Sequence, residues 1–392
     1  MRIVQIANLV TPTSGGIRTV LDRLGRGYLA AGHDVHRIVP GPAPAVAVER
    51  SGVVHTLPGV PLPFSGGYRL LVDPVPVARL LADLNPDRLE VSDRFTLTWV
   101  GSWGMRHDVP STVVVHERLV ETLRTWLPGG IGSGLLAALA DRRLPMQFDR
   151  LVVPSSYAAR SFDHADNVAV VPLGVDLATF RPGRAGDLPE TLRPDPARVR
   201  LVMVGRLSRE KRPLLGVGAL ARLHADGLPV ELHVVGDGPL RRRVERAAAG
   251  LPVTFHGFVG DRRRVGALLG SADVALATCP IETYGLAALE ALACGAPVVA
   301  ARGGALDDLV TPDVGVVVEP DADAMAAGVR RVLDRDRGQL RVAARTRAES
   351  FPWRRTVDHM LRLHRVERPE GSSPAPAAIA PAPSLSDVAG PG

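Results

Sequence analysis

The sequence is poor in several residue types, and each shortage excludes a class of protein. It contains only two cysteines, Cys279 and Cys294, which rules out a disulfide framework and makes a reducing cytoplasm the expected location. Aromatic residues make up 4% of the chain, too few for a protein that binds nucleic acid by stacking on bases. No apolar run approaches the roughly 18 residues that a membrane-spanning helix needs, so no span is expected.

Lysine is the scarcest charged residue. Lys and Arg together number 47, and Lys211 is the single lysine among them. The net charge is only +6 and the arginines are scattered, which indicates solvated faces and argues against a nucleic-acid partner. This basic balance leaves open a peripheral contact with the inner membrane surface. The one position that carries a lysine is a candidate for a specific role.

The length of 392 residues and the hydrophobic content of 46% predict a globular protein with two domains. The first residues, MRIVQIANLV, read as a strand and not as a signal peptide, because polar Gln5 and Asn8 interrupt the apolar run. The stretch 367–392 is dense in Pro, Ala and Ser and lacks the apolar pattern of a core. A disordered tail is therefore expected there.

The amino-terminal part of the chain begins with a strand, a glycine-containing loop, a helix and a second strand. These are predicted at Met1–Ala7, Ile17–Ala31 and Val35–Val39, an order typical of half a nucleotide-binding α/β fold. Gly15 and Gly16 would let a ligand approach the backbone at the start of the helix, although such a pair is also an ordinary turn. The full dinucleotide motif is missing, which disfavours a nicotinamide enzyme.

A second alternation of strands and helices begins near Val199. Strands are predicted at Arg200–Val204, Val230–Val235, Val253–His256, Val274–Thr278, Pro297–Ala300 and Val314–Val318, and helices at Pro213–Asp226, Pro239–Ala249, Arg262–Leu269 and Asp321–Asp334. This alternation predicts a parallel sheet with helices on both faces.

The stretch Cys279–Glu290, read as CPIETYGLAALE, is the strongest candidate for a ligand site. It follows the predicted strand Val274–Thr278 and enters a helix predicted from about Tyr284 to Cys294, and ligands of α/β sheets bind at such strand ends. Glu282 and Glu290 flank the helix start, at most roughly 12 Å apart.

Main-chain amides between the two carboxylates could bind an anion such as a diphosphate. The residues concerned are Thr283, Tyr284, Gly285 and Leu286. Spacing alone also allows a plainer interpretation, in which Glu282 complements the helix dipole and Glu290 lies on a solvated face. A basic turn, Gly205–Pro213, follows another strand end, and its Arg206 and Lys211 could converge on the same diphosphate.

Taken in order, these motifs resemble those of retaining, nucleotide-sugar-dependent glycosyltransferases of the GT-B fold, in family four. The resemblance covers about residues 1–365 and rests on Glu-x7-Glu followed by A-x-A-x-G-x-P-V-V-A. It departs from the family at Leu173, where Asn is usual before Gly-Val-Asp, and at Arg212, where Gly is common after the lysine. It implies two Rossmann-like domains facing across a cleft.

The resemblance also implies the extent of each domain. An acceptor domain would cover 1–178, completed by a helix at about 352–366, and a donor domain would cover 179–351. Acceptor specificity is expected in the first-domain loops Pro58–Leu71 and Glu117–Gly134.

The resemblance assigns roles to individual residues. Glu282 would bind the donor hexose, Glu290 the nucleotide ribose, and Arg206 with Lys211 the leaving diphosphate. Further donor contacts are implied at Gly15, Gly16, His116, Gly236, Val259, Phe258 and the main chain of Thr283 to Leu286. Without the resemblance, a lone histidine such as His116 is more often structural, and Gly236 is equally well an ordinary turn glycine.

The implied function is transfer of a hexose, with retention, from GDP-mannose or a UDP-hexose to a lipid, glycan or small-molecule acceptor. No metal or other cofactor is expected, because cationic side chains and helix amides would neutralise the leaving diphosphate. Two Asp-x-Asp sequences, Asp321–Asp323 and Asp334–Asp336, mimic a metal motif but fall in a region predicted to be helical and exposed.

Two alternatives stay open at this point. A GT-B sugar-nucleotide epimerase would share the fold but would place acid and base side chains around the hexose. A non-catalytic nucleotide-sugar-binding or membrane-associated scaffold would have lost parts of the site.

Overall fold

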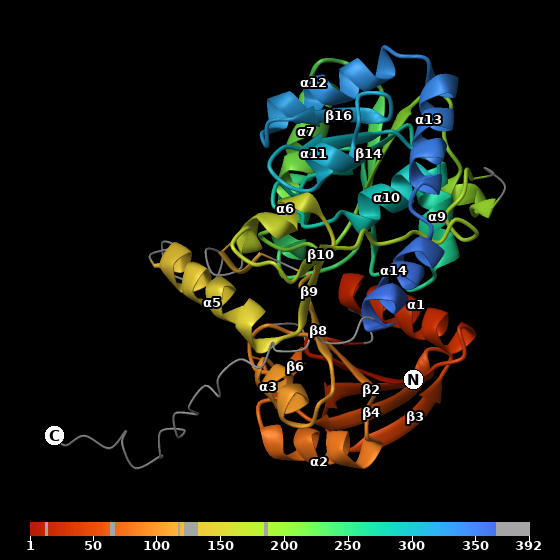
Figure 1. The fold of residues 1–392 in the computed structure, drawn as a ribbon. Helices are drawn as coiled ribbons and strands as arrows, with labels where there is room; N and C mark the ends of the chain where they lie inside the picture. Colours follow the sequence, from red (N-terminus) through yellow and green to blue (C-terminus); the bar gives the residue numbers. More distant parts are fainter. Residues whose placement is uncertain (12–14, 63–66, 117, 121–131, 184–186, 366–392) are drawn as a thin grey trace.

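The computed structural model describes residues 1–11, 15–62, 67–116, 118–120, 132–183 and 187–365. Within these residues the chain forms two α/β lobes, stacked one above the other in Figure 1, each built around a mainly parallel sheet. The α/β fold predicted from the alternating pattern is confirmed.

The first lobe holds an eight-stranded sheet in the order β10-β9-β8-β7-β1-β2-β4-β3. Its strands are β1 (Arg2–Ala7), β2 (Asp34–Gly41), β3 (Ala45–Glu49), β4 (Gly52–Pro58), β7 (Arg88–Ser92), β8 (Ser111–Val114), β9 (Arg150–Val153) and β10 (Val168–Val170). All neighbours pair in parallel except β3, which runs antiparallel to β4 at the edge. The helices of this lobe are α1 (Gly16–Ala30), α2 (Pro74–Leu84), α3 (Trp99–Arg106), α5 (Ser133–Gln147) and α6 (Ser156–Ala159).

The second lobe holds a parallel six-stranded sheet in the order β13-β12-β11-β14-β15-β16. Its strands are β11 (Val199–Val204), β12 (Val230–Val235), β13 (Val253–Gly257), β14 (Val274–Ala277), β15 (Val298–Ala301) and β16 (Gly315–Val318). Its helices are α7 (Pro213–Ala225), α8 (Arg241–Ala247), α9 (Arg262–Gly270), α10 (Leu286–Ala293), α11 (Leu306–Leu309), α12 (Ala322–Leu333) and α13 (Arg337–Glu349). The strands β14, β15 and β16 are short and wholly apolar, as expected where helices cover both faces of a parallel sheet.

The core of the molecule is continuous across the junction of the lobes. One buried apolar cluster includes Leu24 of α1, Val175 and Phe180 of the segment that crosses between the lobes, and Leu289 of α10. Burial of such side chains supplies the main favourable term in folding. The crossing segment is therefore packed on both sides.

The last described helix, α14 (Trp353–Arg365), returns to the first lobe and packs on α1 (Figure 1). The main-chain N–H of Val175 donates to the oxygen of Phe351 at 2.8 Å, just before α14 begins. Near the end of the helix, the buried ring of His364 contacts the Glu90 carboxylate of β7, with Nε2 2.7 Å from Oε1. The carboxyl-terminal helix is thus joined to the first sheet by a buried polar contact.

The structure differs from the sequence predictions at several elements. The strand β3, a short hairpin of β5 (Val60–Pro61) and β6 (Arg69–Leu70), and the helices α3 and α13 were not predicted. The helix α10 begins at Leu286, two residues later than expected, since the chain reaches Gly285 in a left-handed conformation. The predicted disordered tail, 367–392, lies outside the described residues.

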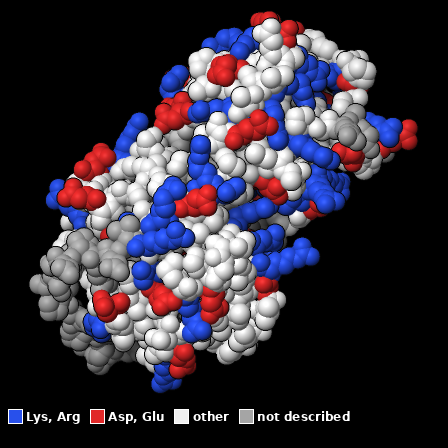
Figure 2. Space-filling view, turned by 45° about the vertical axis from the view of Figure 1, so that its right-hand side comes forward, with Lys and Arg blue, Asp and Glu red and all other residues white. Residues whose placement is uncertain are grey.

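Charged side chains are distributed over both lobes. On the face that Figure 2 shows, basic and acidic side chains are interspersed from end to end. Among the described residues, no helix combines the length and the apolar character needed to cross a bilayer.

Candidate functional site

Most of the predicted donor residues lie along one edge of the second sheet, and Gly15, Gly16 and His116 lie in the first lobe. In the order β13-β12-β11-β14, the loops after the carboxyl ends of four adjacent strands carry Val259, Gly236, Arg206 with Lys211, and Glu282. Ligands of parallel sheets bind at this edge. The strand order therefore places in one row residues that are up to 76 positions apart in the sequence, from Arg206 to Glu282.

The closest contact in this row joins Lys211 to Glu282. The Lys211 Nζ donates to Glu282 Oε2 at 2.6 Å, and the lysine side chain is 34% exposed. Burial alone would lower the pKa of Lys211, but the charge and hydrogen bond of Glu282, together with the nearby Cys279 and Glu210, outweigh it and hold that pKa above its usual value. The lysine is therefore a fixed cation at the strand ends.

Two side chains that sequence reasoning missed hold the lysine loop in place. The Thr278 hydroxyl donates to the main-chain oxygen of Lys211 at 2.6 Å, and the Cys279 Sγ donates to the oxygen of Glu210 at 3.1 Å. Burial raises the pKa of Cys279 to about 12, so it stays a neutral thiol. Both residues directly follow β14, and this adjacency to a strand end was the signal that could have found them.

Arg206 takes a different position from Lys211. Its guanidinium lies over the ring of Tyr68, 5.2 Å from the ring centroid, and Tyr68 belongs to a first-lobe loop expected to shape the acceptor site. A guanidinium at this distance is attracted by the face of an aromatic ring. Arg206 therefore links the edge of the second sheet to a loop of the first lobe.

The loop between Glu282 and α10 touches the first lobe. The Thr283 hydroxyl donates to the main-chain oxygen of His116 at 2.6 Å, and the Ser155 hydroxyl donates to the oxygen of Thr283 at 2.5 Å. The buried Tyr284 hydroxyl donates to the main-chain oxygen of Leu173. Because its side chain is used between the lobes, Tyr284 could meet a donor only through its main chain.

Gly285 sets the geometry at the start of α10. Its φ of 95° favours glycine, and a Cβ at this position would lie 2.3 Å from Cδ2 of Leu306. The first amides of α10 have no carbonyl of their own helix to bind, so they are available to an anion. The start of α1 lies close to the start of α10, because a Cβ on Gly16 would lie 3.9 Å from Cδ1 of Leu286. A Cβ on the exposed Gly15 would contact nothing within 4 Å.

His116 follows strand β8 in the first lobe and is half-buried. Its Nε2 lies 3.0 Å from the Ser92 hydroxyl, and burial lowers its pKa to about 4. At neutral pH the ring is therefore uncharged and suited to hydrogen bonding with a hydroxyl group rather than to donating a proton as an acid.

Glu290 is buried in the second turn of α10 and paired with Arg262 at the start of α9. Burial raises the pKa of Glu290 to about 7, although the charge of Arg262 works in the opposite direction. The Arg262 guanidinium also lies 4.8 Å from the ring centroid of Phe180 in the crossing segment. The plainer interpretation of Glu290 as a solvated residue is wrong, and the partner Arg262 was missed because nothing in the sequence pairs the two.

The crossing segment carries a second ion pair close to Glu290. Arg23 of α1 donates to Asp176 at 2.5 Å, and the charges of both act on the Glu290 carboxyl group. This ion pair joins α1 of the first lobe to the crossing segment. Glu290 of α10 therefore lies close to both α1 and the crossing segment.

Gly236 and Val259 complete the row of strand ends. Gly236 has a φ of 137°, and a Cβ there would lie 2.0 Å from the main-chain oxygen of Gly205. This close approach gives Gly236 a packing role of its own. Val259 is half-buried against the core, whereas its neighbour Phe258 is 52% exposed.

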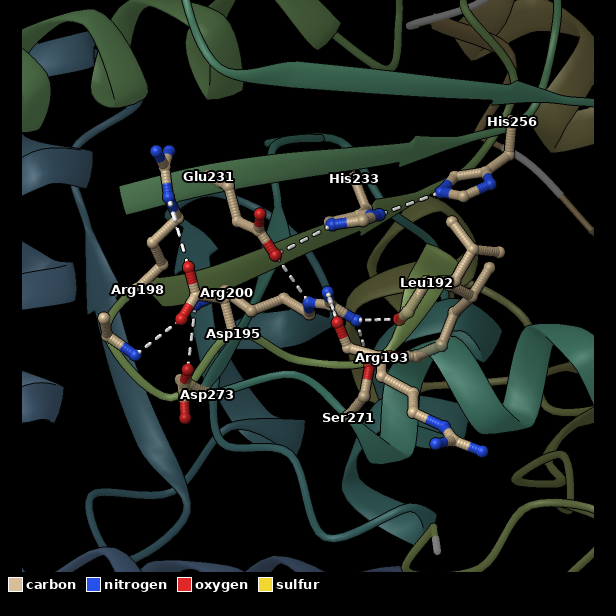
Figure 3. A network of polar contacts seen from close by, with 12 residues as sticks. Leu192, Arg193, Asp195, Arg198, Arg200, Glu231, His233, His256, Ser271 and Asp273 are labelled. Atoms are coloured by element: carbon tan, nitrogen blue, oxygen red, sulfur yellow. Dashed lines mark hydrogen bonds and ion pairs between the residues drawn. The ribbon is translucent and has the colours of Figure 1, made fainter. Parts of the chain in front are cut away.

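A chain of rings and charges joins the strands β12 and β13 (Figure 3). His233 lies between Glu231 and His256, with ring nitrogens 3.0 Å from the carboxylate and 2.9 Å from the His256 ring. Because a carboxylate only accepts, His233 Nε2 carries the proton and His256 donates to Nδ1. Burial lowers the pKa of both rings, that of His256 to about 4, so the pair is uncharged at neutral pH and links β12 to β13.

The same network continues through Arg200 to the segment that precedes the second sheet (Figure 3). The buried Arg200 guanidinium donates to Glu231 at 2.8 Å and to the main-chain oxygens of Leu192 and Arg193 at 2.7 and 3.0 Å. Arg200 thereby fastens the connecting segment to the end of the sheet opposite the candidate site.

The acidic motifs that mimic a metal site have other partners. The Asp321 carboxylate accepts from the amide of Ala324 and that of Asp336 from the amide of Gln339, each at 2.8 Å, so both cap helices. Over the ranges that the structure describes, no cluster of three or more His, Cys, Asp or Glu side chains could hold a metal ion.

Comparison with known proteins identifies the two halves of the chain separately. A family model described as Glycosyltransferase Family 4 matches residues 14–179, and one described as Glycosyl transferases group 1 matches residues 198–335. Over 364 residues the chain is 44% identical to a GDP-mannose-dependent alpha-(1-6)-phosphatidylinositol dimannoside mannosyltransferase of Mycobacterium tuberculosis. That match covers 92% of this chain and 95% of the relative.

A second relative and a solved structure extend the comparison. A D-inositol 3-phosphate glycosyltransferase of Geodermatophilus obscurus is 35% identical over 268 residues, 62% of this chain and 58% of the relative. Sucrose-phosphate synthase from Thermosynechococcus elongatus matches with a TM-score of 0.76 at 23% identity, over 93% of this chain and 98% of that one. This last likeness shows the fold alone, which is the two-lobed GT-B arrangement predicted from the sequence.

Proposed function

The chain belongs to glycosyltransferase family 4, and we propose that it transfers mannose from GDP-mannose to a phosphatidylinositol lipid that already carries mannose. That it is a nucleotide-sugar-dependent hexosyltransferase follows from the family. The donor and the acceptor are our proposal, and the observation that carries both is the 44% identity to the mycobacterial mannosyltransferase over nearly the whole length of both chains.

The acceptor class is supported by a second observation. The two relatives compared above are named for acceptors that contain inositol, one a phosphatidylinositol lipid and one inositol 3-phosphate. The chain matches the lipid-modifying relative over 92% of its length and the other over 62%. The lipid is therefore the acceptor that we propose.

The geometry supports a separate role for each of the site residues in this proposal. Lys211 is held against Glu282, four positions before α10 begins, so it would hold the diphosphate together with the first amides of α10 and Arg206. Glu282 would exchange its ion pair with Lys211 for a hydroxyl of the hexose. Glu290 would accept from the ribose hydroxyls.

We further propose that transfer retains configuration and needs no metal. The acceptor hydroxyl would attack from the side that the diphosphate leaves, and a donor phosphate oxygen would take its proton. Neutral His116 would hydrogen-bond the sugar, since its lowered pKa makes it a poor general acid at neutral pH. Lys211 and Arg206 would neutralise the charge that develops on the leaving diphosphate.

The test is a transfer assay with the full chain. We expect a mannosylated product, detected by mass spectrometry, from GDP-mannose and phosphatidylinositol dimannoside in vesicles, and none from UDP-glucose or UDP-N-acetylglucosamine. Glu282→Ala, purified in parallel, controls for contaminating enzymes and should abolish the product. An equal rate with a UDP-sugar, transfer only to inositol phosphate, or no product from GDP-mannose would each refute the proposal.

A further inference from the structure

The helix α5 is attached to the first lobe along one face only. In Figure 1 it extends away from the body of the molecule, on the side opposite α14. Its buried residues are Ser133, Ala137, Asp141 and Leu144. Asp141 anchors this face, because it forms a buried ion pair with Arg94 in the loop after β7.

The opposite face of α5 is apolar and exposed to solvent. The exposed side chains are Leu135 at 69%, Leu136 at 51%, Leu139 at 48% and Met146 at 70%. At helical spacing, Leu135, Leu139 and Met146 fall within about 40° of one another, directly opposite the buried face. Grouped apolar side chains of this kind mark an interaction surface, whereas a single exposed leucine does not.

Charge on this face has one sign. Arg142 and Arg143 are exposed, and their directions around the helix fall on the two sides of the stripe formed by Leu135, Leu139 and Met146. The only acidic residue of α5 is Asp141, and it is turned inward. An apolar stripe flanked by arginines suits the boundary between the lipid headgroups and the acyl chains.

We propose that α5 docks the protein on the surface of an anionic phospholipid bilayer, with its apolar stripe in the headgroup layer and Arg142 and Arg143 on lipid phosphates. A second copy of the chain fits this face less well. Two α5 helices packed stripe to stripe would bring their arginines together with no acidic residue of the helix to pair with them. Docking goes beyond the donor and acceptor proposed above and can fail separately from them, because the vesicle test contains neither.

Vesicle sedimentation without donor or acceptor tests this assignment. The full chain should bind vesicles of phosphatidylcholine mixed with phosphatidylglycerol about tenfold more tightly than vesicles of phosphatidylcholine alone, and added salt should reduce the difference. The double variant Leu135→Glu, Leu139→Glu should bind the mixed vesicles at least about tenfold more weakly. Val342→Glu on α13 is the control for adding a glutamate at an exposed apolar position outside α5, since Val342 is 68% exposed, and it should bind as the wild type does.

A second pair of variants covers the case in which the glutamates disturb folding. Arg142→Gln with Arg143→Gln should lose most of the preference for anionic vesicles, whereas Arg242→Gln with Arg243→Gln on α8 should keep it, although both remove two exposed charges. Wild-type binding that is absent or indifferent to lipid charge would overturn the proposal. So would α5 variants that bind normally, or a wild-type dimer that the leucine variant dissociates without loss of vesicle binding.

Discussion

Replacing Lys211 by alanine is expected to lower kcat about a hundredfold or more, because the leaving diphosphate would lose the cation that neutralises it. The residue is the single lysine of the chain, and in the structure it contacts Glu282 at 2.6 Å, in the row of strand ends where the donor should lie. A hundredfold loss corresponds to about 2.7 kcal/mol of transition-state stabilisation. The measurement is the steady-state rate of mannosyl transfer at saturating donor.

The control for Lys211→Ala lies in the same turn. Arg209 is exposed, and Arg209→Ala removes one positive charge two positions away from the lysine. It should leave kcat within about twofold, because an exposed charge outside the site is screened by solvent. Equal losses in both variants would mean that net charge matters rather than position, and a near-normal rate in Lys211→Ala would remove the lysine from the mechanism.

The second large effect is expected on stability, from Glu90→Ala. The Glu90 carboxylate is 1% exposed and accepts from Gln5 at 2.9 Å and from the Tyr28 hydroxyl, and it contacts His364 of α14 at 2.7 Å. Removing it leaves three buried polar groups without this partner, which should lower the free energy of unfolding by about 3–5 kcal/mol. Urea unfolding of the wild type and the variant measures the loss.

The pH dependence of the wild type follows from the same contacts. Burial alone would raise the pKa of Glu90, but the hydrogen bonds and charge of its partners, His364 first, hold that pKa below its usual value. The stabilisation is therefore present at neutral pH and is lost as the pH falls through the lowered pKa.

Glu349→Ala serves as the control for Glu90→Ala. The Glu349 carboxylate, paired with Arg345, is 52% exposed, so this pair should contribute less than about 1 kcal/mol to the free energy of unfolding. A loss no larger than in this control would show that Glu90 does not secure α14.

The row of strand ends could be predicted from the sequence because it depends on local patterns. Mainly apolar runs, followed by Gly205, Gly236 and Pro280, predicted β11, β12 and β14, and the residues after each run then had to meet at one edge of a parallel sheet. Lys211 and Glu282 illustrate the result, since two loops 71 positions apart carry side chains in contact. The elements missed were those with weak local signals. Helix α3, for example, holds Gly101 and Gly104, which are poor helix formers.

Partners of the predicted residues were harder to find than the residues themselves. Glu290 was identified by motif, yet its burial and its pair with Arg262 depend on how α9 packs against α10, which no local pattern encodes. The same holds for Tyr68, which reaches Arg206 from the other lobe, and for His364, which reaches Glu90 across 274 positions. Contacts that depend on the relative placement of whole elements carry no sequence signal in a single chain.

We propose that Glu282 binds the sugar of the donor and Glu290 its ribose. Calorimetric titration of GDP and GDP-mannose into the wild type, Glu282→Gln and Glu290→Gln tests this most directly. Glu282 would contact only the sugar, so its variant should bind GDP normally and lose the extra affinity that mannose provides. Glu290 would contact the ribose, so its variant should bind both ligands more weakly by a similar factor, about tenfold for a lost charge-assisted hydrogen bond. Normal binding of both ligands by both variants would contradict the placement of the donor at Cys279–Glu290.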